Sequence, residues 1–315
     1  MQLVTAVDVH ALLDYPFLID ALRVAHREAP PEGQHLIGTE PGGGTNLFVT
    51  LLGWKKDAAI VVKMVGVFAG NLKLSPPQAS VQGLVAVFDA GTGTPRLVAD
   101  GEAMTFRKTA ADSGLGAAFL ARDDAETLLV VGAGGLAPHV LAAHRAARPS
   151  IRRVLIWNRT HERADALAAA TCEPGLQVHA VTDLDAAVPE ADIISCVTMA
   201  RAPLVKGALL KPGAHLDLVG AYLPDMREAD DDAFRRGSVF VDTRNGMEGS
   251  GEISAPVAAG VIGWNAVRAD FYDLASGRHP GRTSADEITV CKNVGGGHLD
   301  LFTAEALMQA LERRG

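Results

Sequence analysis

The chain has 315 residues, of which 48% are hydrophobic and 21% are charged, so it can bury the cores of two domains and is not disordered. Acidic residues outnumber basic ones by 37 to 29, and the resulting net charge of −8 argues against a nucleic-acid-binding surface. The first residues lack a basic head followed by an apolar core, and apolar runs are interrupted before about 18 residues, so we expect neither a secretory signal nor a membrane span.

The first hundred residues predict two helices followed by strands. Apolar residues recur at helical spacing over residues 7–13 and again over 16–27. Residues 29–46 are rich in proline and glycine and are expected to form a loop. Strand-like runs follow at 46–52, 59–67, 83–89 and 95–99, the last two separated by the hairpin signal at 90–93. This region should be an antiparallel or mixed sheet with flanking helices.

The remainder predicts alternating strands and helices. A helix rich in small residues is expected over 103–121, where it would link two domains. Beyond it, we expect strands at 127–132, 153–157, 177–181, 192–196, 215–219 and 238–241. Such alternation is typical of right-handed crossovers and of a doubly wound parallel sheet covered on both faces, which is an α/β fold. An amphipathic helix is expected over 304–313.

A glycine-rich turn predicts a dinucleotide site. The run Gly132-Ala133-Gly134-Gly135-Leu136-Ala137 fits the pattern G-x-G-x-x-A, after a strand and before a helix. Gly132 would permit the tight turn, Gly134 would let the backbone approach a pyrophosphate, and Ala137 would let helix and strand pack closely. The helix N-terminus would offer free N–H groups to the phosphates. The alternative is an ordinary tight connection.

The end of the next strand indicates which dinucleotide binds. NAD sites commonly carry Asp or Glu there, whereas this chain has Asn158, Arg159, Thr160 and, one turn later, Arg163. An amide, a hydroxyl and two guanidiniums suit a 2′-phosphate, so we predict a preference for NADP(H), though not to the exclusion of NAD(H). The alternative is that the arginines are plain surface charges. Later strand ends, which include Thr198 and Gly220, are expected on the nicotinamide side.

The three cysteines, Cys172, Cys196 and Cys291, are far apart and follow neither a zinc pattern nor a disulfide pattern. We therefore expect no metal site, and the cysteines fit a reducing cytoplasm. Cys196 has no base motif beside it and is expected to be a buried strand residue rather than a nucleophile.

Several longer motifs occur in one order with the nucleotide turn. They are VVKMVGVFAGN (61–71), ASVQGLVAVFDAGTG (79–93), MTFRKTAADSGLGAAFLA (104–121) and LKPGAHLDLVGAYLPDMRE (210–228). Together they resemble the ornithine cyclodeaminase/mu-crystallin family over residues 46–305. The resemblance implies a Rossmann domain over 121–291 and an α+β substrate and dimerisation domain over 1–120, rejoined by residues 292–315. It also implies a homodimer.

The resemblance implies a set of site residues, and this chain departs from the family at some of them. The family's lysine beside the substrate carboxylate and reacting nitrogen falls on Lys63, with a strand lysine on a solvated face as the alternative. A carboxylate-binding arginine of the family is replaced by Lys108, next to Arg107, and either cation could hold a carboxylate. Tyr222 stands where cyclodeaminases carry an aspartate, and Asp225 follows three residues later.

A proton donor is less clearly indicated. His298 and Asp300 follow the glycine-rich turn at 295–297. His298 could deliver a proton to the product nitrogen, or it could cap the following helix while Asp300 fixes a turn. The Tyr222 hydroxyl or a bound water could relay the proton instead.

The form GAY-x-PDMRE is similar to the branch of the family that reduces cyclic imino acids. The implied function is NAD(P)H-dependent reduction of 1-pyrroline-2-carboxylate or 1-piperideine-2-carboxylate, cyclic ketimine carboxylates, to proline or pipecolate. One alternative is an ornithine cyclodeaminase, which uses NAD and releases ammonia, although Tyr222 cannot supply a carboxylate base. A second alternative is a mu-crystallin-like protein that binds NADPH without turnover.

Overall fold

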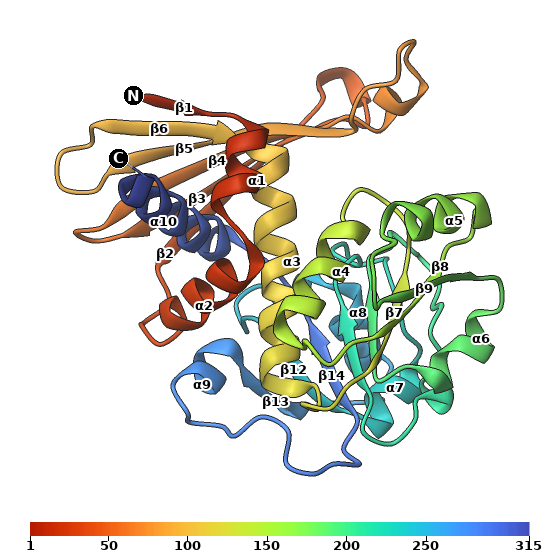
Figure 1. Ribbon diagram of the computed structural model, residues 1–315. Helices are drawn as coiled ribbons and strands as arrows, with labels where there is room; N and C mark the ends of the chain where they lie inside the picture. Colours follow the sequence, from red (N-terminus) through yellow and green to blue (C-terminus); the bar gives the residue numbers. More distant parts are fainter. Residues whose placement is uncertain (315) are drawn as a thin grey trace. The chain divides into compact units, whose positions relative to one another are not determined.

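The computed structural model describes residues 1–314, apart from the side chain of Leu72, and divides into two compact units, named here unit 1 and unit 2 (Figure 1). Unit 1 comprises Met1–Ala25, Ala29–Lys108 and the C-terminal segment from Gly295. Unit 2 comprises His26–Glu28 and Thr109–Val294. Residues 109–120, which the sequence placed in the substrate domain, group with unit 2.

Unit 1 is built on a six-stranded sheet in the order β1-β6-β5-β4-β3-β2, in which the β1–β6 pair is parallel and the other pairs are antiparallel. Its strands are β1 (Gln2–Val4), β2 (Glu32–Thr39), β3 (Leu47–Lys55), β4 (Ala59–Val67), β5 (Val81–Asp89) and β6 (Pro95–Asp100). The mixed sheet expected from the sequence is therefore present.

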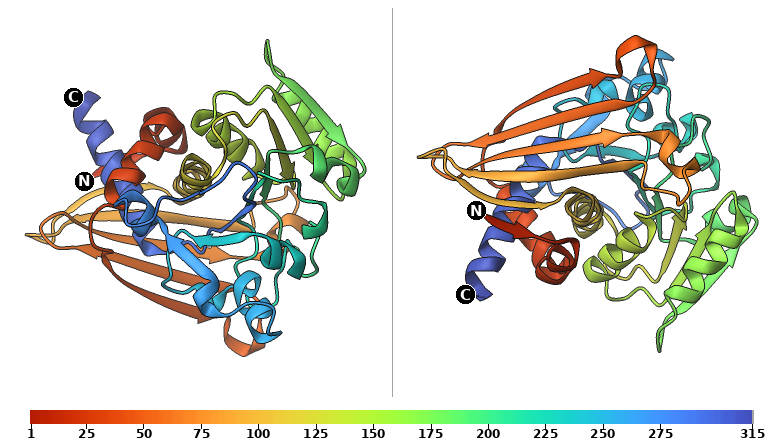
Figure 2. Two further views of the ribbon diagram at one scale, coloured as in Figure 1. Left: turned by 90° about the horizontal axis from the view of Figure 1, so that it is seen from below. Right: turned by 90° about the horizontal axis from the view of Figure 1, so that it is seen from above.

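Helices lie along one face of this sheet. They are α1 (Ala6–Leu12), α2 (Tyr15–Ala25), α10 (Gly297–Arg314) and the first part of α3 (Gly101–Leu120). Thr5 begins α1 with a reciprocal capping box with Asp8. The helix α10 packs on β2, β3 and β4 (Figures 1 and 2). This approach needs glycine at Gly53, where an added Cβ would lie 2.8 Å from the Gly297 carbonyl oxygen.

The expectation of a loop over 29–46 is wrong, because β2 occupies Glu32–Thr39. Every residue of β2 is exposed, and the strand lies at the edge of the sheet, paired only with β3 among the described strands. A strand without a buried face leaves no alternation of apolar and polar residues in the sequence. The flanking prolines and glycines then dominate the local pattern.

Unit 2 is built on an eight-stranded parallel sheet in the order β13-β12-β14-β11-β10-β7-β8-β9. Its strands are β7 (Thr127–Val131), β8 (Arg153–Trp157), β9 (Gln177–Val181), β10 (Ile193–Cys196), β11 (His215–Leu218), β12 (Ser238–Val241), β13 (Val267–Asp270) and β14 (Thr289–Lys292). All residues of β7, β10, β11, β12 and β14 are buried, which requires cover on both faces and confirms the predicted fold class. The sequence pattern missed β13 and β14.

The α-helices of unit 2, besides the second part of α3, are α4 (Ala137–Ala147), α5 (His161–Ala170), α6 (Leu184–Ala187), α7 (Asp231–Arg236), α8 (Gly251–Ala258) and α9 (Phe271–Ala275). Short 3-10 helices lie at Pro41–Gly43, Ala69–Lys73, Val188–Glu190, Gly207–Leu209, Met247–Gly249 and Trp264–Ala266. Among residues 1–314, no helix combines the length and the apolar character needed to cross a bilayer.

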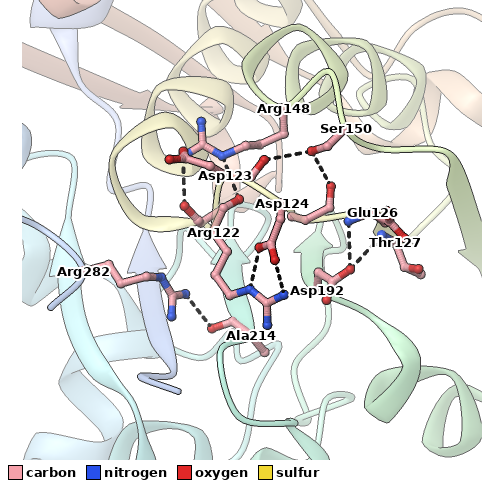
Figure 3. A network of polar contacts seen from close by, with 12 residues as sticks. Arg122, Asp123, Asp124, Glu126, Thr127, Arg148, Ser150, Asp192, Ala214 and Arg282 are labelled. Carbon is pink, nitrogen blue, oxygen red and sulfur yellow. Dashed lines mark hydrogen bonds and ion pairs between the residues drawn. The ribbon is translucent and has the colours of Figure 1, made fainter. Parts of the chain in front are cut away.

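Polar contacts fix the amino-terminal ends of the central strands (Figure 3). The Oδ2 atom of Asp192, just before β10, accepts the backbone N–H groups of Glu126 and Thr127 at 2.9 Å each. Arg148 donates to the carbonyl oxygens of Ala121 and Arg122 at 2.8 and 3.0 Å, at the end of α3. These bonds fix the amino-terminal ends of the strands, whereas ligands bind at the carboxyl ends in such folds.

Candidate functional site

The glycine turn between β7 and α4 has the backbone shape that its sequence predicts. Gly132 has φ 115°, and an added Cβ would lie 3.0 Å from the Val197 carbonyl oxygen, so only glycine fits. An added Cβ at Gly134 would meet no atom within 4 Å, which leaves open space above the turn. The N-cap residue of α4, Leu136, provides no side-chain hydrogen bond. The first turn of the helix is closed by its own backbone instead, because the Ala137 N–H donates to the Gly134 carbonyl at 3.0 Å and the His139 N–H donates to the Leu136 carbonyl at 3.0 Å.

A cavity of about 390 Å³ lies at the carboxyl ends of β7, β8 and β10. The two central strands β7 and β10 are neighbours in the sheet, and the strand order reverses at that point, which is where such folds bind nucleotides. The cavity is lined by Gly132, Ala133, Gly134, Trp157, Asn158, Arg159, Thr160, Arg163, Val197, Thr198, Met199, Ala200 and Leu204. Most predicted cofactor residues therefore meet in one place. Gly135, Ala137 and Gly220 are not part of its lining.

Asn158 connects the glycine turn to the loop after β8. Its Oδ1 atom accepts the Ala133 N–H at 3.1 Å, and its Nδ2 atom donates to the Thr160 carbonyl at 2.8 Å. Arg159 and Arg163 are exposed, and among residues 1–314 neither guanidinium forms an ion pair. The hydroxyl of Thr160 does not cap α5. The cavity therefore ends at two uncompensated cations and an uncapped helix N-terminus.

Unit 1 contains a second cluster, formed by Lys63, Lys108 and Asp300. The Lys108 Nζ lies 2.6 Å from Asp300 Oδ1, and the Lys63 Nζ lies 3.6 Å from the same oxygen. The three residues are 5%, 6% and 1% exposed. Lys63 shares the buried face of β4 with Val61 and Val65, so it does not lie on a solvated face.

This cluster carries one positive charge in excess. Among the described residues, Asp300 is the one carboxylate within ion-pair distance of either ammonium. Burial lowers the pKa of Lys63 to about 8, and the nearby Lys108 charge adds to this effect, while Asp300 opposes it. A buried, uncompensated cation is costly, and an anionic ligand would neutralise it.

Arg107 is directed to other partners. Its Nε donates to His10 Nδ1 at 3.0 Å, its Nη2 donates to the His10 carbonyl at 2.9 Å, and its guanidinium lies 4.6 Å from the centre of the Tyr15 ring. Burial is the main reason why the pKa of Tyr15 rises to about 12, against the influence of Arg107. These contacts tie α3 to α1 and α2, so Lys108 and not Arg107 joins the Asp300 cluster.

The remaining predicted residues are dispersed. His298 lies in the first turn of α10, half-buried, with its ring 5.9 Å from that of Phe302 in an edge-on contact. Tyr222 follows β11 and is 54% exposed. Asp225 forms an ion pair with Arg201 at the surface of unit 2.

A group of buried charges in unit 2 was not predicted from the sequence: Glu228, Glu252 and Lys292 are each fully buried. The Lys292 Nζ donates to the carbonyl oxygens of Leu218 and Val219 at 3.1 and 3.2 Å. A signal was available, because Lys292 follows the apolar run ITVC just as Lys63 interrupts one. The described residues hold no group of three His, Cys, Asp or Glu side chains suited to a metal ion.

Comparison with known proteins places these features in a family. The chain is 40% identical over 305 residues to the Δ1-pyrroline-2-carboxylate reductase of Paracoccus denitrificans, covering 96% of this chain and 95% of the relative. It is 43% identical over 248 residues to Protein SAR DEFICIENT 4 of Arabidopsis thaliana, covering 78% of this chain and 76% of that protein.

The solved structure of Thermococcus litoralis Δ1-pyrroline-2-carboxylate reductase in complex with NADH and L-proline is similar to this fold. Its TM-score is 0.92 at 28% identity, and the match covers 100% of this chain and 98% of that one. The profile of the ornithine cyclodeaminase/mu-crystallin family matches residues 50–313. The chain therefore belongs to the ornithine cyclodeaminase/mu-crystallin family.

Proposed function

We propose that the protein is an NAD(P)H-dependent oxidoreductase that reduces a cyclic ketimine carboxylate, 1-pyrroline-2-carboxylate or 1-piperideine-2-carboxylate, to proline or pipecolate. In this proposal unit 2 binds the cofactor and unit 1 binds the substrate. The relatives that match the chain over most of its length support it, since they include Δ1-pyrroline-2-carboxylate reductases.

The observation that carries the proposal for this chain is the excess positive charge in the Lys63–Lys108–Asp300 cluster. A substrate with one carboxylate would bring this buried cluster to neutrality. We assign carboxylate binding chiefly to Lys108, which Asp300 holds at 2.6 Å. Arg107 is assigned to the support of α1 and α2, because His10 and Tyr15 already occupy its guanidinium.

Reduction of a carbon–nitrogen double bond needs a hydride at carbon and a proton at nitrogen. A bound reduced nicotinamide supplies the hydride. We assign the proton to Lys63, whose pKa is lowered by burial to about 8, so its ammonium is a stronger acid than an ordinary lysine. In these substrates the imine nitrogen and the carboxylate are attached to the same carbon, so a cluster that binds one is within reach of the other. Lys63 would regain its proton from solvent.

For the cofactor, we propose that NADPH is preferred to NADH. Arg159 and Arg163 line the cavity without a carboxylate partner, and a 2′-phosphate would supply one. The uncapped N-terminus of α5 would add favourable N–H groups. The glycine turn would receive the pyrophosphate, as proposed from its open space.

An ornithine cyclodeaminase is an alternative function, and the residues of the β11 loop argue against it. The position of the cyclodeaminase aspartate is Tyr222, and the nearest carboxylate along the segment, Asp225, is paired with Arg201. Neither side chain offers a free carboxylate base near the β11 loop. A binding protein of the mu-crystallin type, with NADPH but no turnover, remains the other outcome of the test below.

We also propose a homodimer formed through the face of the unit 1 sheet that α10 does not cover. The strand register places apolar side chains together there, namely Leu36, Phe48, Leu52, Trp54, Ile60, Val62, Met64 and Leu84. Leu36 is 70% exposed and Phe48 51% exposed, which is unusual for a continuous apolar face in water. Light scattering should give twice the chain mass, and Phe48→Asp should reduce it.

The proposed compartment is the cytoplasm. Cys172, Cys196 and Cys291 are all free thiols, which fits a reducing environment. Fractionation of the source cells, with an antibody against the chain, would test this assignment.

The decisive experiment is to follow NADPH oxidation with each cyclic imine and to quantify the amino acid produced. We expect one equivalent of proline or pipecolate for each NADPH consumed. In parallel, the protein is incubated with ornithine and NAD, and ammonia is measured; none should appear. Ammonia release would favour the cyclodeaminase, and tight NADPH binding with no oxidation by either imine would favour the non-catalytic protein.

A further inference from the structure

The buried carboxylate of Glu228 bonds to two cavity loops at once. Its Oε1 accepts the Thr198 backbone N–H at 2.6 Å and the Thr198 hydroxyl at 2.8 Å, in the loop after β10. Its Oε2 accepts the N–H groups of Gly220 and Ala221 at 2.7 and 3.3 Å, in the loop after β11. Glu228 is fully buried, and each oxygen serves a different loop.

These two loops touch through their backbones, so a small displacement would change the cavity. An added Cβ at Gly220 would collide with the Thr198 carbonyl oxygen. On the other side, an added Cβ at Gly132 would lie 3.1 Å from the Thr198 Cγ2. Thr198 therefore lies between the glycine turn and Gly220, and it is closely packed against both. It also lines the cavity.

The carboxylate is itself held in place. The Glu228 N–H donates to Glu252 Oε2 at 2.7 Å, and the Ala229 N–H donates to Glu252 Oε1 at 3.1 Å. The fully buried Lys292 donates to the carbonyl oxygens of Leu218 and Val219 at the end of β11, and its charge acts on Glu228. A group fixed at this many points can impose a geometry on the loops that it bonds.

We propose that Glu228 is a positioning residue for the cofactor, because its carboxylate sets the spacing of the β10 and β11 loops and thereby places Thr198 and Gly220 at the nicotinamide half of the site. The inference rests on the proposed dinucleotide site. It concerns the half of that site that is common to NADPH and NADH, whereas Arg159 and Arg163 concern the 2′-phosphate.

The test is Glu228→Gln, which keeps the volume but turns one acceptor oxygen into an N–H donor facing N–H groups. The matched control is Asp192→Asn, which makes the same chemical change in a carboxylate. Asp192 accepts two backbone N–H groups at the amino-terminal ends of the strands of the same sheet, away from the cavity (Figure 3). Both variants should lower the melting temperature. Of these two variants, only Glu228→Gln should alter the affinity for the cofactor.

Dissociation constants for NADPH and NADH are measured by nicotinamide fluorescence on the full chain, without substrate. We expect Glu228→Gln to weaken both cofactors by about 10-fold and by the same factor, because an N–H donor replaces one of the two acceptor oxygens that hold the loops of the shared half of the site. Asp192→Asn should change either constant by less than about twofold. In turnover assays, the KM for the cyclic imine should stay within about twofold for Glu228→Gln.

Unchanged cofactor binding in a folded Glu228→Gln protein would overturn the inference, and so would equal weakening by Asp192→Asn. If Glu228→Gln does not fold, Thr198→Val removes the hydroxyl bond to Oε1 and a longer bond of 3.4 Å from the Ala200 N–H, and it leaves the Thr198 N–H bond to Oε1 in place. This variant should weaken both cofactors by about threefold. Equal affinity in Thr198→Val would then count against it. Failure of the wild-type protein to bind either cofactor would instead defeat the proposed function.

Discussion

Each unit buries a cluster of charges, and the two clusters differ in the groups that compensate these charges. In unit 2, the charge of Lys292 acts on Glu228 and Glu252, and the oxygens of both glutamates accept backbone N–H groups. Arg227 lies 3.8 Å from Glu252 at the margin of that cluster. In unit 1, Lys63 and Lys108 share the single carboxylate of Asp300. Neither ammonium donates to a backbone carbonyl among residues 1–314.

The difference separates a structural cluster from a binding cluster. Burial raises the pKa of Glu228 to about 8 and lowers the pKa of Lys63 to about 8, so both groups resist ionisation. The unit 2 cluster offsets this cost with protein donors and needs nothing more. The unit 1 cluster keeps one charge that the protein does not match, and a ligand carboxylate would match it. The predictions below test this contrast.

The largest expected effect comes from Lys108→Met, which removes the excess charge of unit 1 and leaves Asp300 with Lys63. We expect kcat/KM for the cyclic imine to fall roughly 100-fold, since a charge-assisted contact to the substrate carboxylate is worth about 2–3 kcal/mol. NADPH oxidation at several imine concentrations measures it. The affinity for NADPH in the absence of imine should not change.

A matched control is Lys55→Met. Lys55 on β3 also pairs with an acidic residue of α10, Glu305, at 3.5 Å, but that pair is partly exposed. This variant should keep kcat/KM within about twofold, because exposed pairs contribute little. Lys108→Arg, which restores the family's residue, should retain activity. A Lys108→Met enzyme with normal kcat/KM would remove the basis for a carboxylate site at this cluster.

The pH dependence of the rate tests the role of Lys63. The acid form of Lys63 predominates below its pKa of about 8, so kcat/KM should be level there and fall as pH rises above 8. The expected slope is about tenfold per pH unit, as for loss of a single required proton.

The imine substrate also titrates, and Lys63→Arg separates the two contributions. A guanidinium stays protonated over this range, so the limb near pH 8 should disappear in the variant, with a lower plateau. A limb that persists unchanged in Lys63→Arg would belong to the substrate or to another group, and the proton assignment would be wrong.

Arg159→Ala tests whether the unpaired arginines of unit 2 bind the 2′-phosphate of NADPH. The KM for NADPH should rise about 10-fold, while the KM for NADH should change by less than about twofold, because only NADPH carries the 2′-phosphate. Arg235→Ala is the control, since Arg235 is an exposed arginine already paired with Asp232 at 2.8 Å. Equal increases for both cofactors would contradict a phosphate site at Arg159.

The sequence predicted the nucleotide turn well because that site is local. A strand, a glycine turn and a helix follow one another along the chain, and each glycine has a backbone reason that can be stated beforehand. The parallel sheet was likewise predicted from alternation. The strands β13 and β14 were missed, although β10, β11 and β12 have the same length of four residues and were predicted. Two of the four residues of β13 are charged and β14 ends in Lys292, so neither sequence forms an uninterrupted apolar run.

The lysine cluster was only partly predictable. Lys63 was selected because the family's site lysine falls on this position, and the structure places it on the buried face of β4. Its partners come from α3 and α10, at residues 108 and 300, and no local pattern specifies such pairing. The same holds for Arg107, adjacent to Lys108 in sequence, because one helical step of about 100° directs the two side chains to different neighbours.

The smallest effect is expected for Tyr222→Phe, which separates the proton source proposed in unit 1 from a donor on the β11 loop of unit 2. Tyr222 is 54% exposed, so water can replace its hydroxyl. We therefore expect kcat to fall by less than about threefold in saturating NADPH, with an unchanged limb near pH 8. A general acid typically contributes 10²- to 10⁴-fold. A loss of that size for Tyr222→Phe would move the donor to unit 2, and the excess charge of unit 1 would then serve substrate binding alone.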